Sequence, residues 1–198
     1  MKYFSTLVCV LTFFVMNAQD NNNQELAYAE IPAYPESYTP GSVVSRMIDG
    51  LGFRYYWATE NLRDTDLAYR PGNDSRSVDE TLDHILGLSR VILNSAIQSP
   101  NDRSTASQEA LSFTEKRYRT LNNLKKASLV FLNSDKLEDY PVIFKNPTGE
   151  TKFPFWNQIN GPIADALWHC GQIVSFRRQA GNPFPEGVNV LTGTRRKQ

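Results

Sequence analysis

Residues 155–181, which read FWNQINGPIADALWHCGQIVSFRRQAG, constrain the fold of this chain more than any other stretch. Apolar side chains recur there every three or four residues, which is the period of one face of an α-helix. They are Ile159, Ile163, Ala166, Leu167, Cys170, Ile173 and Val174. The stretch therefore predicts a long helix at residues 157–180 that packs through one face against the rest of the protein.

Three further segments have the same helical period, at residues 42–62, 77–98 and 107–133. The second opens with Ser77 and has Glu80 three positions later, which is the pattern of a capping box at the start of a helix. The sequence thus predicts four long helices in a chain with no internal repeat.

The connection between the third and fourth predicted helices has the character of short strands. Residues 142–145 and 151–155 flank a turn that contains Pro147 and Gly149. Four helices with one long connection are typical of a four-helix bundle. We therefore predict an all-α fold, with a short β-hairpin or ordered loop between the third and fourth helices and no sheet larger than that hairpin.

The composition excludes partners that a strongly charged chain would attract. The 198 residues include 21 Lys and Arg against 21 Asp and Glu. This balance provides no overall field for nucleic acid, and the basic cluster at residues 195–197 is typical of a solvated tail. With 40% hydrophobic residues, the chain is expected to form one globular domain with a sizeable core.

The N-terminal segment has the composition of a secretory signal peptide. Lys2 precedes an apolar run at residues 7–16 that is too short to span a bilayer, and small and polar residues follow. We predict cleavage near Ala18 or Gln19 and a secreted or periplasmic protein with no membrane contact after cleavage. The predicted signal peptide, extended lead-in, bundle and irregular tail comprise residues 1–19, 20–41, 42–182 and 183–198.

Cysteine usage leaves no disulfide in the mature chain. Cys9 belongs to the predicted signal peptide, so Cys170 would be the only cysteine of the mature protein. It lies in the apolar face of the fourth predicted helix with no basic residue on its own stripe. We therefore interpret Cys170 as a small buried hydrophobe rather than a reactive thiol.

Both histidines of the chain fall on predicted helices. His169 follows Asp165 by four residues, so the two side chains point to the same side of the fourth helix. His84 lies at the edge of the apolar face of the second helix, beside Leu88 and Val91. Each histidine alone is compatible with an ordinary helix residue, and Asp165 and His169 with a hydrogen-bonded surface pair. A metal site requires that His84 meets the other two.

The segments SVDETLDHILGLS and ADALWHCGQI resemble the corresponding helices of the DinB-like superfamily. This superfamily of four-helix bundles includes YfiT-type metal-dependent hydrolases and thiol-dependent S-transferases, and the resemblance spans about residues 42–183. Its usual ligands are one histidine on the second helix and two, four residues apart, on the fourth. The resemblance thus implies a metal site at His84, Asp165 and His169, with Asp165 in place of the middle histidine. Two imidazoles and a carboxylate suit a divalent transition metal such as Zn²⁺, Ni²⁺, Fe²⁺ or Mn²⁺.

The functional expectation follows from this resemblance. It implies a secreted metal-dependent hydrolase or S-transferase-like enzyme that acts on a small molecule, and it identifies neither the substrate nor a catalytic side chain. The alternative is a non-catalytic binding or structural protein that keeps the helical bundle with a degenerate metal site.

Five other residues are candidates for further roles. Gln172 either orients a metal-bound water or a neighbouring imidazole, or is an ordinary polar residue on a helix flank. Arg177 and Arg178 either bind an anionic substrate or stabilise a helix C-terminus, and the second role is preferred because the helix dipole favours it. Bundles of this kind pair through helix faces, and Tyr55 and Tyr56 are the candidates for a homodimer contact.

Overall fold

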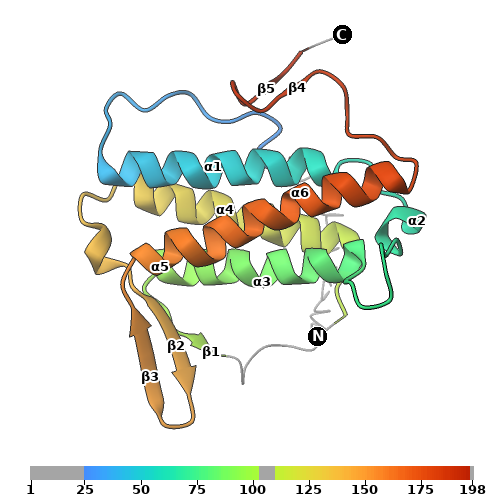
Figure 1. The fold of residues 1–198 in the computed structure, drawn as a ribbon. Helices are drawn as coiled ribbons and strands as arrows, with labels where there is room; N and C mark the ends of the chain where they lie inside the picture. The colour runs from blue at the N-terminus through green and yellow to red at the C-terminus, as the bar shows by residue number, and fades with distance from the viewer. Residues whose placement is uncertain (1–24, 103–109, 197–198) are drawn as a thin grey trace, which may run out of the picture.

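The protein is mostly helical. The computed structural model describes residues 25–102 and 110–196, and the longest elements within these ranges are four helices (Figure 1). They are α1 (Pro40–Thr59), α3 (Val78–Ala96), α4 (Phe113–Leu132) and α6 (Ala164–Gln179). Both α1 and α3 pack against α4 and α6, and apolar side chains from all four helices form one core.

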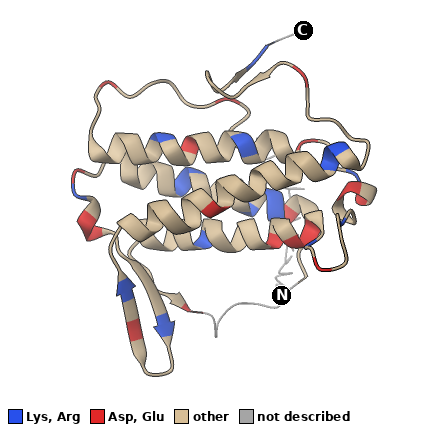
Figure 2. Cartoon of the chain, viewed as in Figure 1, with Lys and Arg blue, Asp and Glu red and all other residues tan. Residues whose placement is uncertain are grey.

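No helix in the described ranges is long and apolar enough to cross a membrane. Charged residues of both signs are spread over the ribbon (Figure 2).

Hydroxyl side chains determine where three of these helices begin. Thr39, Ser77 and Ser112 each accept a hydrogen bond from the backbone N–H three residues later. At Ser77 and Ser112, the glutamate at that later position accepts the serine N–H in return. The capping box predicted at Ser77 is therefore confirmed.

The predicted start of the third helix is wrong. We expected the helix at residues 107–133, but α4 begins at Phe113, and residues 110–112 are not helical. The capping box at Ser112 satisfies free N–H groups of the first turn and fixes the start there. The earlier residues of the expected segment, 103–109, lie outside the described part of the chain.

The fourth predicted helix is present but is not a regular α-helix. It comprises α5 (Trp156–Gln158), a π-helical turn at Ile159–Ile163 and then α6. Pro162 lies inside the π turn. Proline has no N–H to donate and its ring collides with a carbonyl of the preceding α-helical turn, so the wider turn accommodates it. Asp165 lies two residues after the end of this π turn, and functional residues are often found near such turns.

A three-stranded sheet replaces the expected two-stranded hairpin. The hairpin itself is confirmed as β2 (Val142–Asn146) paired antiparallel with β3 (Gly149–Phe153). The prediction of no larger sheet is wrong, because β1 (Asn101–Asp102) adds to β2 in parallel. The buried Asn101 side chain donates to the carbonyl of Ile143 at 2.9 Å, which attaches β1 to the sheet.

The lead-in packs against α1 through an aromatic side chain, and the tail is more ordered than expected. In the lead-in, Tyr28 is buried over Gly52, where a Cβ would lie 2.4 Å from its ring, and its hydroxyl donates to Asp49. The tail, expected to be irregular, contains the short paired strands β4 (Val188–Asn189) and β5 (Thr194–Arg195). The loop after α1 contains the four-residue helix α2 (Asp64–Leu67). The predicted signal peptide lies outside the described residues.

The proposed homodimer contact at Tyr55 is wrong, because its side chain is fully buried in the core. Tyr56 is half-buried and stacks under the guanidinium of Arg117, whose carbon lies 4.6 Å from the ring centroid. A homodimer contact through Tyr56 stays a prediction.

Candidate metal centre

The two histidines and Asp165 meet between α3 and α6. His84 Nε2 lies 3.1 Å from Asp165 Oδ2, and His169 Nε2 lies 3.2 Å from Asp165 Oδ1. The imidazole rings are perpendicular, with their centroids 4.6 Å apart. One ligand atom from each residue lies within 4.8 Å of the others. The predicted convergence of His84, Asp165 and His169 is therefore confirmed, across 81 residues of sequence.

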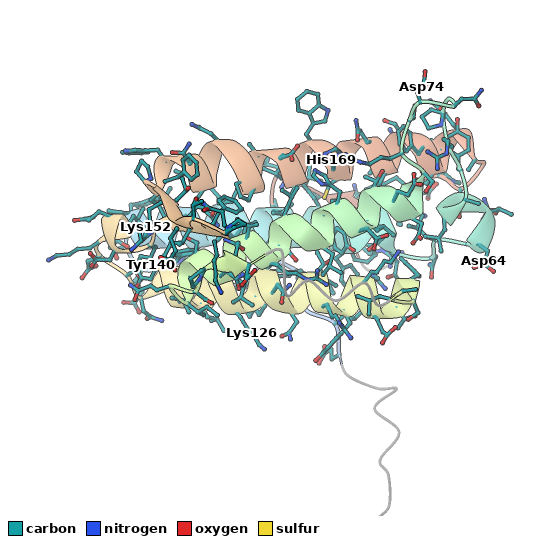
Figure 3. The ribbon with its side chains drawn as sticks, turned by 90° about the horizontal axis from the view of Figure 1, so that it is seen from below. Asp64, Asp74, Lys126, Tyr140, Lys152 and His169 are labelled. Carbon is teal, nitrogen blue, oxygen red and sulfur yellow. The ribbon has the colours of Figure 1, made fainter. Side chains whose placement is uncertain are left out.

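Each side chain reaches this point because of the helix that carries it. Asp165 and His169 are one turn apart on α6, so they project from the same side of that helix. His84 comes from the first half of α3, which packs against α6. Figure 3 shows His169 on the side of α6 that faces α3. The cluster is shallow: the side chains of His169, His84 and Asp165 are 12%, 31% and 38% exposed, so a small molecule can reach it.

The contact with Gln172 determines which ring nitrogen of His169 carries the proton and which one presents a lone pair to the Asp165 carboxylate. Gln172 Oε1 lies 2.6 Å from His169 Nδ1, so Nδ1–H is the donor. A neutral ring then has an unprotonated Nε2, which lies 3.2 Å from Asp165 Oδ1. Two acceptors at this distance repel each other unless a cation lies between them, either a second ring proton or a metal ion.

His84 does not have the same conflict. A neutral His84 with its proton on Nε2 donates directly to Asp165 Oδ2 at 3.1 Å, and this contact alone is an ordinary hydrogen bond. The argument for a cation therefore depends on His169 and its contact with Gln172. Sequence reasoning left two roles open for Gln172, and the structure supports the orienting one.

The two contacts between Asp165 and the imidazoles have the spacing of neighbouring ligands in a coordination shell. Ligands about 2.1 Å from a metal ion lie roughly 3.0 Å apart in octahedral geometry and 3.4 Å apart in tetrahedral geometry. The two separations from Asp165 to the imidazoles, 3.1 and 3.2 Å, fall between these values. The donor set therefore suits a divalent transition metal. Ligand atoms about 2.1 Å from one ion lie at most about 4.2 Å apart, so the three atoms, which span up to 4.8 Å, would move slightly closer on binding.

Two grooves approach the cluster from different sides. A groove of about 810 Å³ is lined by His84 and Asp165, and a second of about 580 Å³ by His169 and Gln172. The first runs along α3 toward the β1–β2 edge, and the second lies between α6 and the loop before α3. Sequence reasoning did not identify these walls, because a two-residue strand and a connecting loop have no hydrophobic period to detect.

The other candidate residues have structural roles. Cys170 is fully buried, and burial raises the pKa of its thiol to about 12, so it is not a thiolate at neutral pH. Arg177 is also buried, and its Nη1 donates to the last carbonyls of α1, at Trp57 and Ala58. The predicted interpretation of Cys170 as a buried hydrophobe and of Arg177 as a structural residue is confirmed.

Comparison of the chain with protein-family models, with curated proteins and with solved structures gave no match. The class to which the protein belongs is therefore defined by its own fold and site: a mostly helical protein with a His/Asp/His cluster at the junction of two long helices.

Proposed function

We propose that this protein is a DinB-like four-helix-bundle metalloprotein with one divalent transition metal held by His84, Asp165 and His169. The observation that carries the proposal is the pairing of both imidazole Nε2 atoms with the two oxygens of a single carboxylate, within 4.8 Å. The lone pair of His169 fixed by Gln172 supports a cation at this position. The packing of α1 and α3 against both α4 and α6 supports the bundle.

The proposed activity is metal-dependent hydrolysis or group transfer on a small molecule. When bound, such an ion supplies Lewis acidity, which polarises a carbonyl or lowers the pKa of a bound water. The side chains of the cluster would hold the ion. His84 and His169 present Nε2, Asp165 contributes the anionic ligand, and Gln172 keeps His169 in the tautomer that leaves Nε2 unprotonated. The two grooves give substrate and solvent separate approaches to the same point.

The rival proposal is a binding or structural protein without catalysis. It is favoured by one observation, the contact between His84 and Asp165, which satisfies both groups without an ion. The arrangement at His169 is compatible with it when a second ring proton, in place of a metal ion, lies between His169 Nε2 and Asp165 Oδ1.

Metal analysis of protein purified without a histidine tag tests the proposal. We expect about one equivalent of transition metal in the wild type, and loss of the metal in His84→Ala and His169→Ala. Asp165→His is expected to retain the ion, because imidazole is a ligand of the same kind. Asp64→Asn is the control, since Figure 3 shows Asp64 at the end of the molecule, away from His169. Metal-free wild type after reconstitution with Zn²⁺, Ni²⁺, Fe²⁺ and Mn²⁺ in turn would leave the non-catalytic proposal standing.

Export from the cytoplasm is part of the same proposal and rests on the composition of residues 1–19. Intact-mass measurement of the protein from its native compartment is expected to show an N-terminus near Gln19 or Asp20. Recovery of the chain with Met1 retained contradicts export and leaves the metal site unaffected.

A further inference from the structure

The larger groove beside the cluster is long and follows α3. Its α3 wall extends from Asp83 and His84 to Asn94, and Phe144 of β2 also lines it. The ten residues from His84 to Asn94 correspond to about 15 Å of helix. A groove of this length and of about 810 Å³ accommodates an elongated small molecule with one end at the cluster.

Two glycines keep this groove open. A Cβ added at Gly87 or at Gly161 would meet no heavy atom within 4 Å, and both residues line the groove. Gly87 lies inside α3, where glycine is less favourable than alanine by about 1 kcal/mol. The helix thus carries a destabilising residue at a point where a larger side chain would project into the groove.

The charges of the groove are unevenly compensated. Asp83 is bound by Lys116 at 2.9 Å, and Asp102 by Lys145 at 2.9 Å. The third carboxylate, Asp165, faces the two imidazoles. Arg90 also lines the groove, and none of the ion pairs in the described ranges involves it. The unmatched charge of the groove wall is therefore the guanidinium of Arg90.

We infer that this groove binds elongated small molecules with an anionic group, which pairs with Arg90 while the other end reaches the cluster. Arg90 follows His84 by six residues, which is about 9 Å along α3 and roughly 120° around its axis, so the anionic group and the reacting end are separated by a chain of at least that length. A guanidinium suits a carboxylate or a phosphate because it donates two parallel hydrogen bonds. The inference rests on the proposed function, since the second anchor is the metal-bearing cluster.

Two chelating probes of equal length separate charge from shape. Suberic monohydroxamate carries a metal-chelating hydroxamate at one end and a carboxylate at the other, and its carboxamide analogue lacks only the charge. Both are titrated by calorimetry into the metal-loaded mature protein. We expect the carboxylate probe to bind about fivefold more tightly, the upper range for a solvent-accessible ion pair. Arg90→Gln removes this preference and Arg90→Lys keeps most of it.

Two further variants control the experiment. Arg178→Gln removes an exposed arginine of α6 that lines a different groove, and it is expected to leave the preference unchanged. Gly87→Leu fills the groove and is expected to weaken both probes at unchanged metal content and helicity.

The outcomes distinguish the two proposals. Equal affinity of the two probes for metal-loaded wild type overturns the inference and leaves the metal site standing. So does a preference that survives Arg90→Gln, or unchanged binding in Gly87→Leu. Failure of the wild type to take up metal overturns the proposed function, and the inference falls with it.

Discussion

Two aspartates near α6 have opposite surroundings. Asp165 lies in α6, and Asp66 is bonded to Asn182, just after the end of that helix. Asp66 is fully buried, and its carboxylate accepts from the Arg63 guanidinium at 2.8 and 3.0 Å and from Asn182 Nδ2 at 2.6 Å. The Arg63 hydrogen bonds hold its pKa far below the ordinary value of 3.8. Asp165 is 38% exposed, and each of its oxygens faces one imidazole nitrogen.

The difference indicates what each carboxylate is for. The donors around Asp66 already satisfy its charge, and they join the loop after α1 to the end of α6, so this aspartate is structural. At Asp165, the neighbouring nitrogens can bind either protons or an ion, and the site is open to two grooves. A carboxylate that is saturated with donors stabilises a fold, and one that faces lone pairs has capacity for a cation.

The largest expected effect contrasts the two residues in metal-free protein. Asp66→Ala should lower the free energy of unfolding by about 2–3 kcal/mol, because the hydrogen bonds from Arg63 and Asn182 to a buried, charged acceptor are lost. Asp165→Ala should change it by less than about 1 kcal/mol, since this carboxylate is partly solvated. Urea denaturation in the presence of a chelator measures both. Equal losses in the two variants would show that Asp165 is as structural as Asp66.

An intermediate effect is expected at Gln172. Gln172→Ala should weaken metal affinity about tenfold, or about 1.4 kcal/mol, because His169 loses the acceptor that fixes its tautomer. Competition titration against a coloured chelator measures this. Gln172→Glu keeps an acceptor for Nδ1–H and should bind as the wild type does. Gln179→Ala, on the same helix and bonded to Tyr69 instead, is the matched control, and an equal loss there would remove the special role of Gln172.

The smallest expected effect concerns pH and Asp66. Its pKa is depressed in the folded protein, so its contribution is complete above the unfolded value of 3.8 and is lost as the pH falls toward the folded value. Between pH 5 and pH 3, this loss amounts to about 1 kcal/mol. Urea midpoints should therefore fall less steeply with acid in Asp66→Asn than in the wild type. Parallel slopes would mean that Asp66 is not held in its charged form by folding.

The sequence predicted those parts of the fold that depend on a repeated local pattern. The long helices follow from apolar residues spaced three or four apart, which orient each helix toward a common core. This spacing left open whether His84 meets Asp165 and His169, and that meeting was expected from the resemblance to the DinB-like superfamily. The position of Ser77 at a helix start was also readable, because a capping box is a local motif.

The features that the sequence did not predict depend on contacts between distant segments. Strand β1 has two residues, and it exists because Asn101 bonds to Ile143, more than forty positions away. Burial of Tyr55 depends on how α1 packs against its neighbours, which its own spacing leaves open. The unmatched charge of Arg90 likewise becomes visible only when Asp83 and Asp102 are seen to have their own lysines.

The π turn at Ile159–Ile163 has a consequence for the rotational phase of the helix. Each residue of an α-helix turns the chain by about 100°, so Trp156 and Trp168, twelve residues apart, would differ by roughly 120° in a regular helix. A π turn absorbs about one residue, which reduces the difference to roughly 20°. Accordingly, Trp156 and Trp168 have nearly the same exposure, 73% and 72%. Removing one residue from this turn would rotate Asp165 and His169 together by about 100° away from His84, so the direction in which the cluster faces is set by the length of a single turn.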